Sequence, residues 1–164
     1  MNVDPIFETF NRHQVGYLLI GGMNFLLRHQ PVLTFDVDLW IEDTAENRAR
    51  CEAALCDLGA EWGRTDADWG PVANKGVGWL SQQGVFSLNC AAAPVDVFRR
   101  VEGLASWNES RANAVPGKTQ QGTPYFGLSD EDMLKCQLAL DEGMRRQDRV
   151  RFLEQVLRSQ DEKP

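Results

Sequence analysis

The stretch Leu33-Thr34-Phe35-Asp36-Val37-Asp38-Leu39-Trp40-Ile41 carries the strongest local pattern in the chain. Side chains alternate between the two faces of a β-strand, so the three aliphatic residues that follow Asp36 share one face. Asp36 and Asp38 then share the other face and lie a few ångströms apart. The pattern predicts a strand with one apolar face for the core and a pair of carboxylates on the opposite face.

The segments around this strand alternate between helical and extended patterns. Apolar spacing and end signals predict helices over residues 4–13, 23–29, 43–58, 129–140 and 144–159. Short apolar runs predict further strands over residues 15–20, 85–90 and 94–98. Gly21-Gly22 follows the first of these strands and indicates a tight turn before a helix. The expected fold class is therefore α/β, with a mixed β-sheet flanked by helices.

Two segments have no clear period. Residues 60–84 scatter Trp62, Trp69 and Trp79 among glycines and aspartates, which indicates a hairpin with long loops. The segment either forms a lid over a site or, as we prefer, uses its tryptophans to cover the edge of the sheet. Residues 116–127 are expected to be rich in turns.

Length and composition are those of one ordinary globular domain. The 164 residues, 43% hydrophobic and 25% charged, fit a single unit with a core over about residues 15–127 and a helical segment over about 128–159. No apolar run reaches the ~20 residues that cross a bilayer, and the start of the chain lacks a secretory signal. We therefore expect a cytoplasmic protein with no membrane partner.

Charge and cysteine content exclude other classes. The four cysteines form no C-x-x-C pair, so four reduced thiols are expected rather than a zinc site or a disulfide framework. A net charge of −7 argues against a broad nucleic-acid surface. Five arginines between residues 145 and 158 leave room for a local basic platform on the last helix.

The carboxylates carry the functional prediction. Asp36 and Asp38 repel each other unless a cation lies between them, and a third carboxylate, Asp96, sits in the strand expected over residues 94–98. Magnesium, or manganese in its place, prefers carboxylate and phosphate oxygens. Three converging carboxylates would suit a two-metal site that activates a hydroxyl and binds a triphosphate.

Other residues would contact the phosphates. Gly21 and Gly22 allow a phosphate to approach the backbone at a helix N-terminus. Asn24, in the first turn of that helix, could donate to a phosphate oxygen, and so could Lys135 in a later helix. Each signal is weak alone, and a plain α/β domain with surface aspartates remains an alternative.

Together these motifs resemble those of the DNA polymerase beta-like nucleotidyltransferase superfamily. The matching stretches are Tyr17-Leu18-Leu19-Ile20-Gly21-Gly22, Thr34 to Ile41, and Pro94-Val95-Asp96-Val97-Phe98, with looser matches at 128–135 and 146–148. More narrowly, the chain is similar to small bacterial nucleotidyltransferases that include toxins of type IV toxin–antitoxin systems. The resemblance covers about residues 15–157 and implies a minimal nucleotidyltransferase fold with C-terminal helices.

The resemblance also implies an activity. Members transfer a nucleoside monophosphate from a triphosphate to a hydroxyl, with Asp36, Asp38 and Asp96 as metal-binding catalytic residues. The acceptor stays open between RNA, a protein and a small molecule, and an antitoxin partner is possible. Many relatives have an arginine where this chain has Val32. That departure favours the alternative, a catalytically weak or inactive module that acts through a protein partner.

Overall fold

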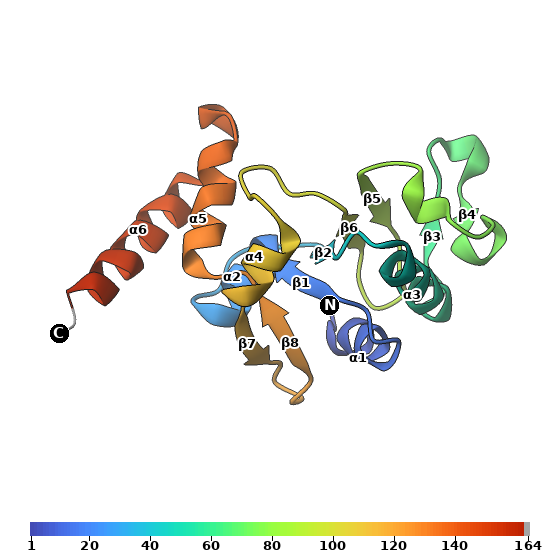
Figure 1. Ribbon diagram of the computed structural model, residues 1–164, viewed down its shortest axis with the longest axis horizontal. Helices are drawn as coiled ribbons and strands as arrows, with labels where there is room; N and C mark the ends of the chain where they lie inside the picture. Colours follow the sequence, from blue (N-terminus) through green and yellow to red (C-terminus); the bar gives the residue numbers. More distant parts are fainter. Residues whose placement is uncertain (163–164) are drawn as a thin grey trace.

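The computed structural model, which describes residues 1–162, is built around one mixed six-stranded sheet (Figure 1). Its strands in spatial order are β5 (Val85–Leu88), β6 (Val95–Phe98), β2 (Val37–Ile41), β1 (Tyr17–Ile20), β8 (Pro124–Gly127) and β7 (Val115–Lys118). Two pairs, β2 with β6 and β1 with β8, are parallel, and the remaining neighbours are antiparallel. The expected fold class, a mixed sheet flanked by helices, is confirmed.

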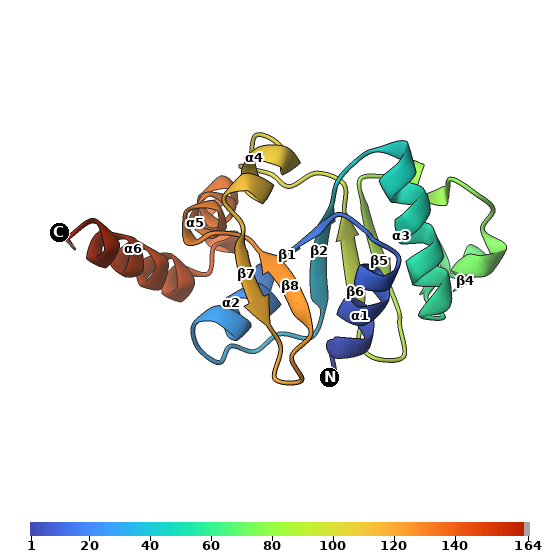
Figure 2. The same cartoon turned by 60° about the horizontal axis from the view of Figure 1, so that its bottom comes forward.

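Helices α1 (Asp4–Arg12) and α3 (Ala45–Asp57) cover one face of the sheet (Figure 2). The aliphatic face of β2 lies here, and Val37, Leu39 and Ile41 are fully buried in the larger of two apolar clusters. The helix α3 begins where Thr44 accepts a hydrogen bond from the Asn47 backbone N–H. Burial of this face is the main stabilising contribution to the sheet.

The opposite face carries the polar side of β2 and is covered by C-terminal helices. A second apolar cluster joins Leu18, Ile20 and Trp40 of the sheet to Met133 and Leu153. The last two residues belong to α5 (Asp130–Ala139) and α6 (Gln147–Asp161), which a 3₁₀ turn, Glu142–Met144, connects. Both helices lie at the end of the molecule opposite the hairpin of β3 (Glu61–Trp62) and β4 (Gly70–Pro71) (Figure 1).

Helix α2 (Gly21–Arg28) is clasped to the start of α5 by charged side chains. Asp130 is buried and lies 3.2 Å from an Arg28 nitrogen and 2.7 Å from His29 Nε2. Ser129 caps α5 by accepting a hydrogen bond from the Asp132 backbone N–H, as its sequence predicts. The clasp fixes α5 and α6 relative to the strand–helix turn at Gly21.

Residues 60–84 form a small hairpin at the sheet edge. Strands β3 (Glu61–Trp62) and β4 (Gly70–Pro71) pair, with 3₁₀ turns at Asp66–Asp68, Val72–Asn74 and Trp79–Ser81. Trp62 stacks on Trp79 with ring centroids 5.4 Å apart, and both rings contact Phe86 of edge strand β5. These two tryptophans cover the edge of the sheet as preferred, whereas Trp69 is exposed.

Three local expectations need correction. The strand expected over 33–41 begins only at Val37, because its neighbours end there: Val37 pairs with the first residue of β6, and β1 ends opposite Asp38. The turn-rich stretch 116–127 contains the hairpin β7–β8, which extends the sheet. A short helix, α4 (Trp107–Ala112), was not expected, and its Trp107 ring nitrogen donates to the Trp40 carbonyl.

No helix within residues 1–162 has both the length and the apolar composition needed to cross a bilayer.

Candidate active site

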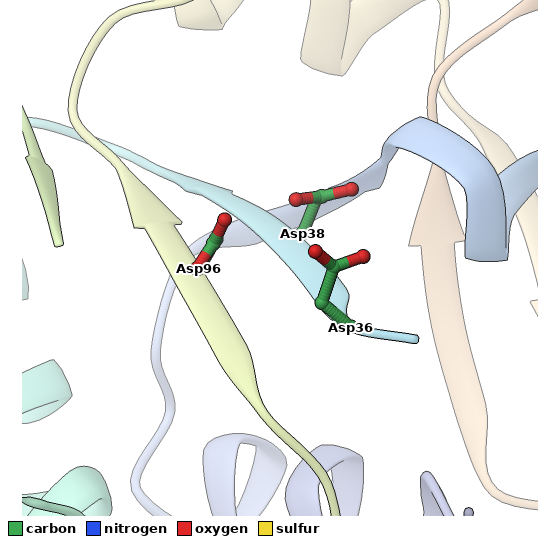
Figure 3. Close-up of side chains that lie close together, drawn as sticks. All are labelled: Asp36, Asp38 and Asp96. Atoms are coloured by element: carbon green, nitrogen blue, oxygen red, sulfur yellow. The ribbon is translucent and has the colours of Figure 1, made fainter. Parts of the chain in front are cut away.

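Three carboxylates converge where β2 and β6 run side by side (Figure 3). Asp38 lies on β2 directly beside Asp96 on β6, and Asp36 precedes β2 on the same side. Each of the three offers an oxygen within 4.8 Å of the oxygens of the other two. The parallel register brings Asp38 and Asp96 together, and Asp36, just before β2, completes the convergence that the sequence predicted.

The cluster is electrostatically strained without a cation. Burial, then the charges of Asp36 and Asp96, raise the pKa of Asp38 from 3.8 to about 7, although Arg149 lowers it in part. Burial also raises the pKa of Asp96, with a smaller opposing contribution from a hydrogen bond to Ser87. A half-buried carboxylate group of this kind favours either a bound proton or a bound cation.

The donor set fits a hard divalent cation. All three candidate ligands are carboxylate oxygens, the type that Mg²⁺ and Mn²⁺ prefer, and they are half-buried rather than dispersed on the surface. One wall of the cluster is also shaped for close approach, because a Cβ on Gly21 would overlap Asp38 Oδ2. Asp36, Asp38 and Asp96 are therefore the residues that could hold the metal.

Gly21 and Gly22 form the first turn of α2, beside these carboxylates. Gly21 has a φ of +66°, which an L side chain rarely adopts, and Gly22 leaves no room for a Cβ because Thr34 Oγ1 would lie 2.9 Å from it. The residue before the helix, Ile20, provides no side-chain cap. The free N–H groups of this turn can therefore bind an anion.

Asn24 does not lie where a phosphate contact requires. It is fully buried, and its amide nitrogen donates to the Leu128 carbonyl over 3.1 Å. Gly127 packs so closely that a Cβ there would overlap Asn24 Oδ1. The third residue of α2 after Gly21 points into the core, so Asn24 ties α2 to the strand–helix junction after β8 instead of facing a ligand.

Lys135 is also remote from the glycine turn. Its ammonium is exposed and pairs with Asp132 at 3.0 Å on the same helix, α5. It is absent from the walls of both pockets that contain Asp38. The helix phase of α5 accounts for this: Met133, Cys136 and Gln137 face the site, and Lys135 faces away from it.

Arg149 supplies the positive charge that was expected of Lys135. It extends from α6 to within 3.4 Å (Nη2) of where a Cβ of Gly22 would lie, and it is half-buried. Together with Arg146 it lines an open polar pocket of about 630 Å³ that also contains Gly21 and Asp36. In the sequence Arg149 was one of five clustered arginines, and only the packing of α6 distinguishes it.

Comparison with known proteins identifies the fold. No protein-family model matches the chain, and no curated protein is detectably similar in sequence. Among solved structures, it is similar to ANT(2'')-Ia in complex with adenylyl-2''-tobramycin, with a TM-score of 0.60, 15% identity, and coverage of 94% of this chain and 87% of that chain. It is also similar to the lincosamide antibiotic adenylyltransferase LnuA bound to lincomycin, with a TM-score of 0.52, 15% identity, and coverage of 91% and 92%.

The chain thus has the fold of the nucleotidyltransferases. That fold was expected from the sequence motifs and is confirmed over nearly the whole chain. Neither of these neighbours is described as a toxin, so the narrower resemblance to toxin–antitoxin proteins stays a prediction.

Replacement of Gly21 by alanine tests the crowding at Asp38. Gly59 is a matched control, because its φ of +62° is nearly the same but no atom lies within 4 Å of the position that a Cβ would take there. Both substitutions should lower the free energy of unfolding by about 1 kcal/mol, because alanine is strained at a positive φ. Gly21→Ala should cost a further ~1–3 kcal/mol because Asp38 must move. Urea unfolding measures both, and equal losses would show that Asp38 is not held against Gly21.

The pH dependence of stability tests the strain in the carboxylate cluster. Because the pKa of Asp38 is raised from 3.8 to about 7, its stabilising protonated form is present below about pH 4 and is lost as the pH rises through 7. Without metal, Asp38→Asn should therefore be more stable than wild type at pH 8, by up to about 4 kcal/mol, and equal to it near pH 4. Added magnesium should reverse the difference at pH 8.

Asp43→Asn is a control in which the change in stability at pH 8 should have the opposite sign. Burial alone would raise the pKa of Asp43, but hydrogen bonds from Arg99 and Arg48 lower it overall. This variant should be less stable than wild type at pH 8. Unfolding curves for the three proteins across this pH range provide the measurement, and a loss of stability in Asp38→Asn at pH 8 without metal would contradict the assignment.

Proposed function

We propose that this protein is a metal-dependent nucleotidyltransferase that moves a nucleoside monophosphate from a nucleoside triphosphate to a hydroxyl group. The observation that carries the proposal is the convergence of Asp36, Asp38 and Asp96 beside the uncapped helix turn at Gly21 and Gly22. The proposed cation site at the carboxylates is therefore adjacent to the proposed anion site at the glycine turn. A metal–triphosphate complex needs both.

Each residue has a separate role in the proposal. Asp36, Asp38 and Asp96 would hold Mg²⁺ or Mn²⁺, which when bound lowers the pKa of an attacking hydroxyl and neutralises phosphate charge. The N–H groups of Gly21 and Gly22 would bind phosphate oxygens, and Arg149, beside Gly22, would pair with the triphosphate. Asp96, on the strand farther from the glycine turn, would accept the proton of the acceptor hydroxyl.

The charge of Arg149 bears on the alternative of an inactive module acting through a protein partner. That alternative rested on Val32, which replaces an arginine common among relatives, on the lack of an obvious basic channel, and on the small size of the chain. Val32 does line the polar pocket and adds no charge. Arg146 and Arg149 contribute two positive charges to the same pocket from the C-terminal side. We therefore favour an active enzyme over an inactive module.

Thermal unfolding with metal and triphosphates tests the proposal. A triphosphate at 100 times its dissociation constant should stabilise the wild type by about 2.7 kcal/mol, and only when Mg²⁺ or Mn²⁺ is present. The double variant Asp36→Ala/Asp38→Ala should lose this response while remaining folded. A response that persists without metal, or in the double variant, would place the nucleotide elsewhere.

Arg149→Ala tests the source of positive charge. Loss of a charge-assisted hydrogen bond to phosphate should weaken triphosphate affinity about tenfold or more. Arg151→Ala is the control, since Arg151 is an exposed arginine on the same helix and does not line the polar pocket. Calorimetric titration in magnesium gives both affinities, and equal affinities for the two variants would remove Arg149 from the site.

A further inference from the structure

A second, apolar cavity adjoins Asp38. It has a volume of about 380 Å³ and lies between the second face of the sheet and helix α5. Apolar side chains dominate its wall, among them Phe98 of β6, Leu128, and Met133 of α5. Asp38 and Arg149 belong to this cavity and to the polar pocket alike. Gly21 also lines both, so the two spaces meet at Asp38 and the glycine turn.

The apolar cavity extends across β2 to strands that the polar pocket does not reach. Both spaces contain Gly21, which follows β1, but only the apolar cavity continues to Phe98 of β6 and Val85 of β5. Strand β2, with Asp38, lies between β1 and β6. In a phosphoryl transfer the attacking and leaving oxygens lie roughly in line on opposite sides of the phosphorus. If the triphosphate occupies the glycine side, the acceptor approaches from the part of the apolar cavity beside β6.

The wall of the cavity selects against polycations. Its acidic side chains within the described part of the chain are Asp38, which we assign to metal, and Glu102 at the exposed rim. Arg100 and Arg149 add two positive charges. An aminosugar with several ammonium groups could pair only one of them, with Glu102. Its other ammonium groups would lie unpaired against apolar side chains. An apolar ligand would instead bury its surface against them.

We infer that the acceptor is a largely apolar alcohol whose body occupies this cavity and whose hydroxyl faces Asp38 and Asp96. The inference rests on the proposed function and names the substrate class of the same site. The acceptor oxygen forms a bond to the α-phosphorus while the bond from that phosphorus to the pyrophosphate oxygen breaks. The hydroxyl proton passes to the Asp96 carboxylate, and the products are the nucleoside monophosphate ester of the alcohol and pyrophosphate.

The exposed rim of the polar pocket offers a place for the nucleobase outside the apolar cavity, which leaves that cavity to the acceptor. Leu33, Phe35 and Met144 are exposed to 78%, 70% and 70%, and all three border that pocket. Large apolar side chains at the mouth of a phosphate-binding pocket offer a surface on which a nucleobase can stack. The competing arrangement, with the nucleobase inside the apolar cavity, is an outcome of the test.

The test uses phenylhexanol as an apolar alcohol and tobramycin as a polycationic acceptor. Each is added to the wild-type protein with magnesium and a triphosphate, and thermal unfolding and mass spectrometry detect binding and the ester. Cys136→Phe fills the cavity, because Cys136 lines it. Cys56→Phe makes the same substitution at an exposed cysteine of α3, outside the cavity.

Phenylhexanol should raise the thermal stability of the wild type and of Cys56→Phe, and both proteins should convert it to the ester. Tobramycin should do neither. In Cys136→Phe the kcat/KM for the alcohol should fall at least about tenfold, with triphosphate affinity within about twofold of wild type. If Cys136→Phe does not fold, Val85→Trp makes the same test from the exposed edge strand, because Val85 also borders the cavity.

Other results separate two kinds of failure. A wild type that binds no triphosphate with metal refutes the proposed function itself. Normal triphosphate binding together with no binding of phenylhexanol, or with modification of tobramycin in preference to it, refutes the acceptor class alone. Equal losses of triphosphate affinity and alcohol transfer in Cys136→Phe place the nucleobase in the cavity and overturn the inference.

Discussion

Three half-buried carboxylates lie close together beside the sheet, and they repel one another when all are charged. Parallel pairing of β2 and β6 brings Asp38 and Asp96 side by side, and burial together with their mutual charge raises the pKa of Asp38 to about 7. Such a cluster is a cost to the folded protein unless a proton or a cation is bound. The apolar face of β2, buried against α1 and α3, provides the stability that holds this cluster in place.

The elements around the cluster fit this constraint. Gly21 has no side chain because Asp38 occupies the space a Cβ would need, and the same turn presents free N–H groups. The clasp of Arg28, His29 and Asp130 sets α5 and α6 over the second face of the sheet. As a result Arg149 reaches the polar pocket, and an apolar cavity extends from the glycine turn to β6. The contacts of Asp130 with Arg28 and His29 thus help to position both Arg149 and the apolar cavity.

Similarity of fold and chemistry of the site give different information here. The structural likeness to antibiotic adenylyltransferases at 15% identity shows the fold, and the carboxylates and glycine turn support the transfer of a nucleotide. The acceptor depends on side chains that such distant proteins need not share. The wall around Phe98, Met133 and Cys136 is a feature of this chain's own side chains, and its apolar character is the basis for the acceptor class proposed above.

Local periodicity was enough to predict the mixed sheet, its flanking helices and the closeness of Asp36 and Asp38. Asp38 lies on β2 as predicted, whereas Asp36 lies just before the strand, because the neighbouring strands end there. Strand β8 and helix α4 gave no periodic signal, because their places depend on pairing with β1 and packing on Trp40. Asn24, Lys135 and Arg149 were all ordinary polar residues in helices. Only tertiary packing decided that Asn24 is buried, Lys135 faces away and Arg149 enters the site, because the rotation of a helix about its axis depends on its neighbours.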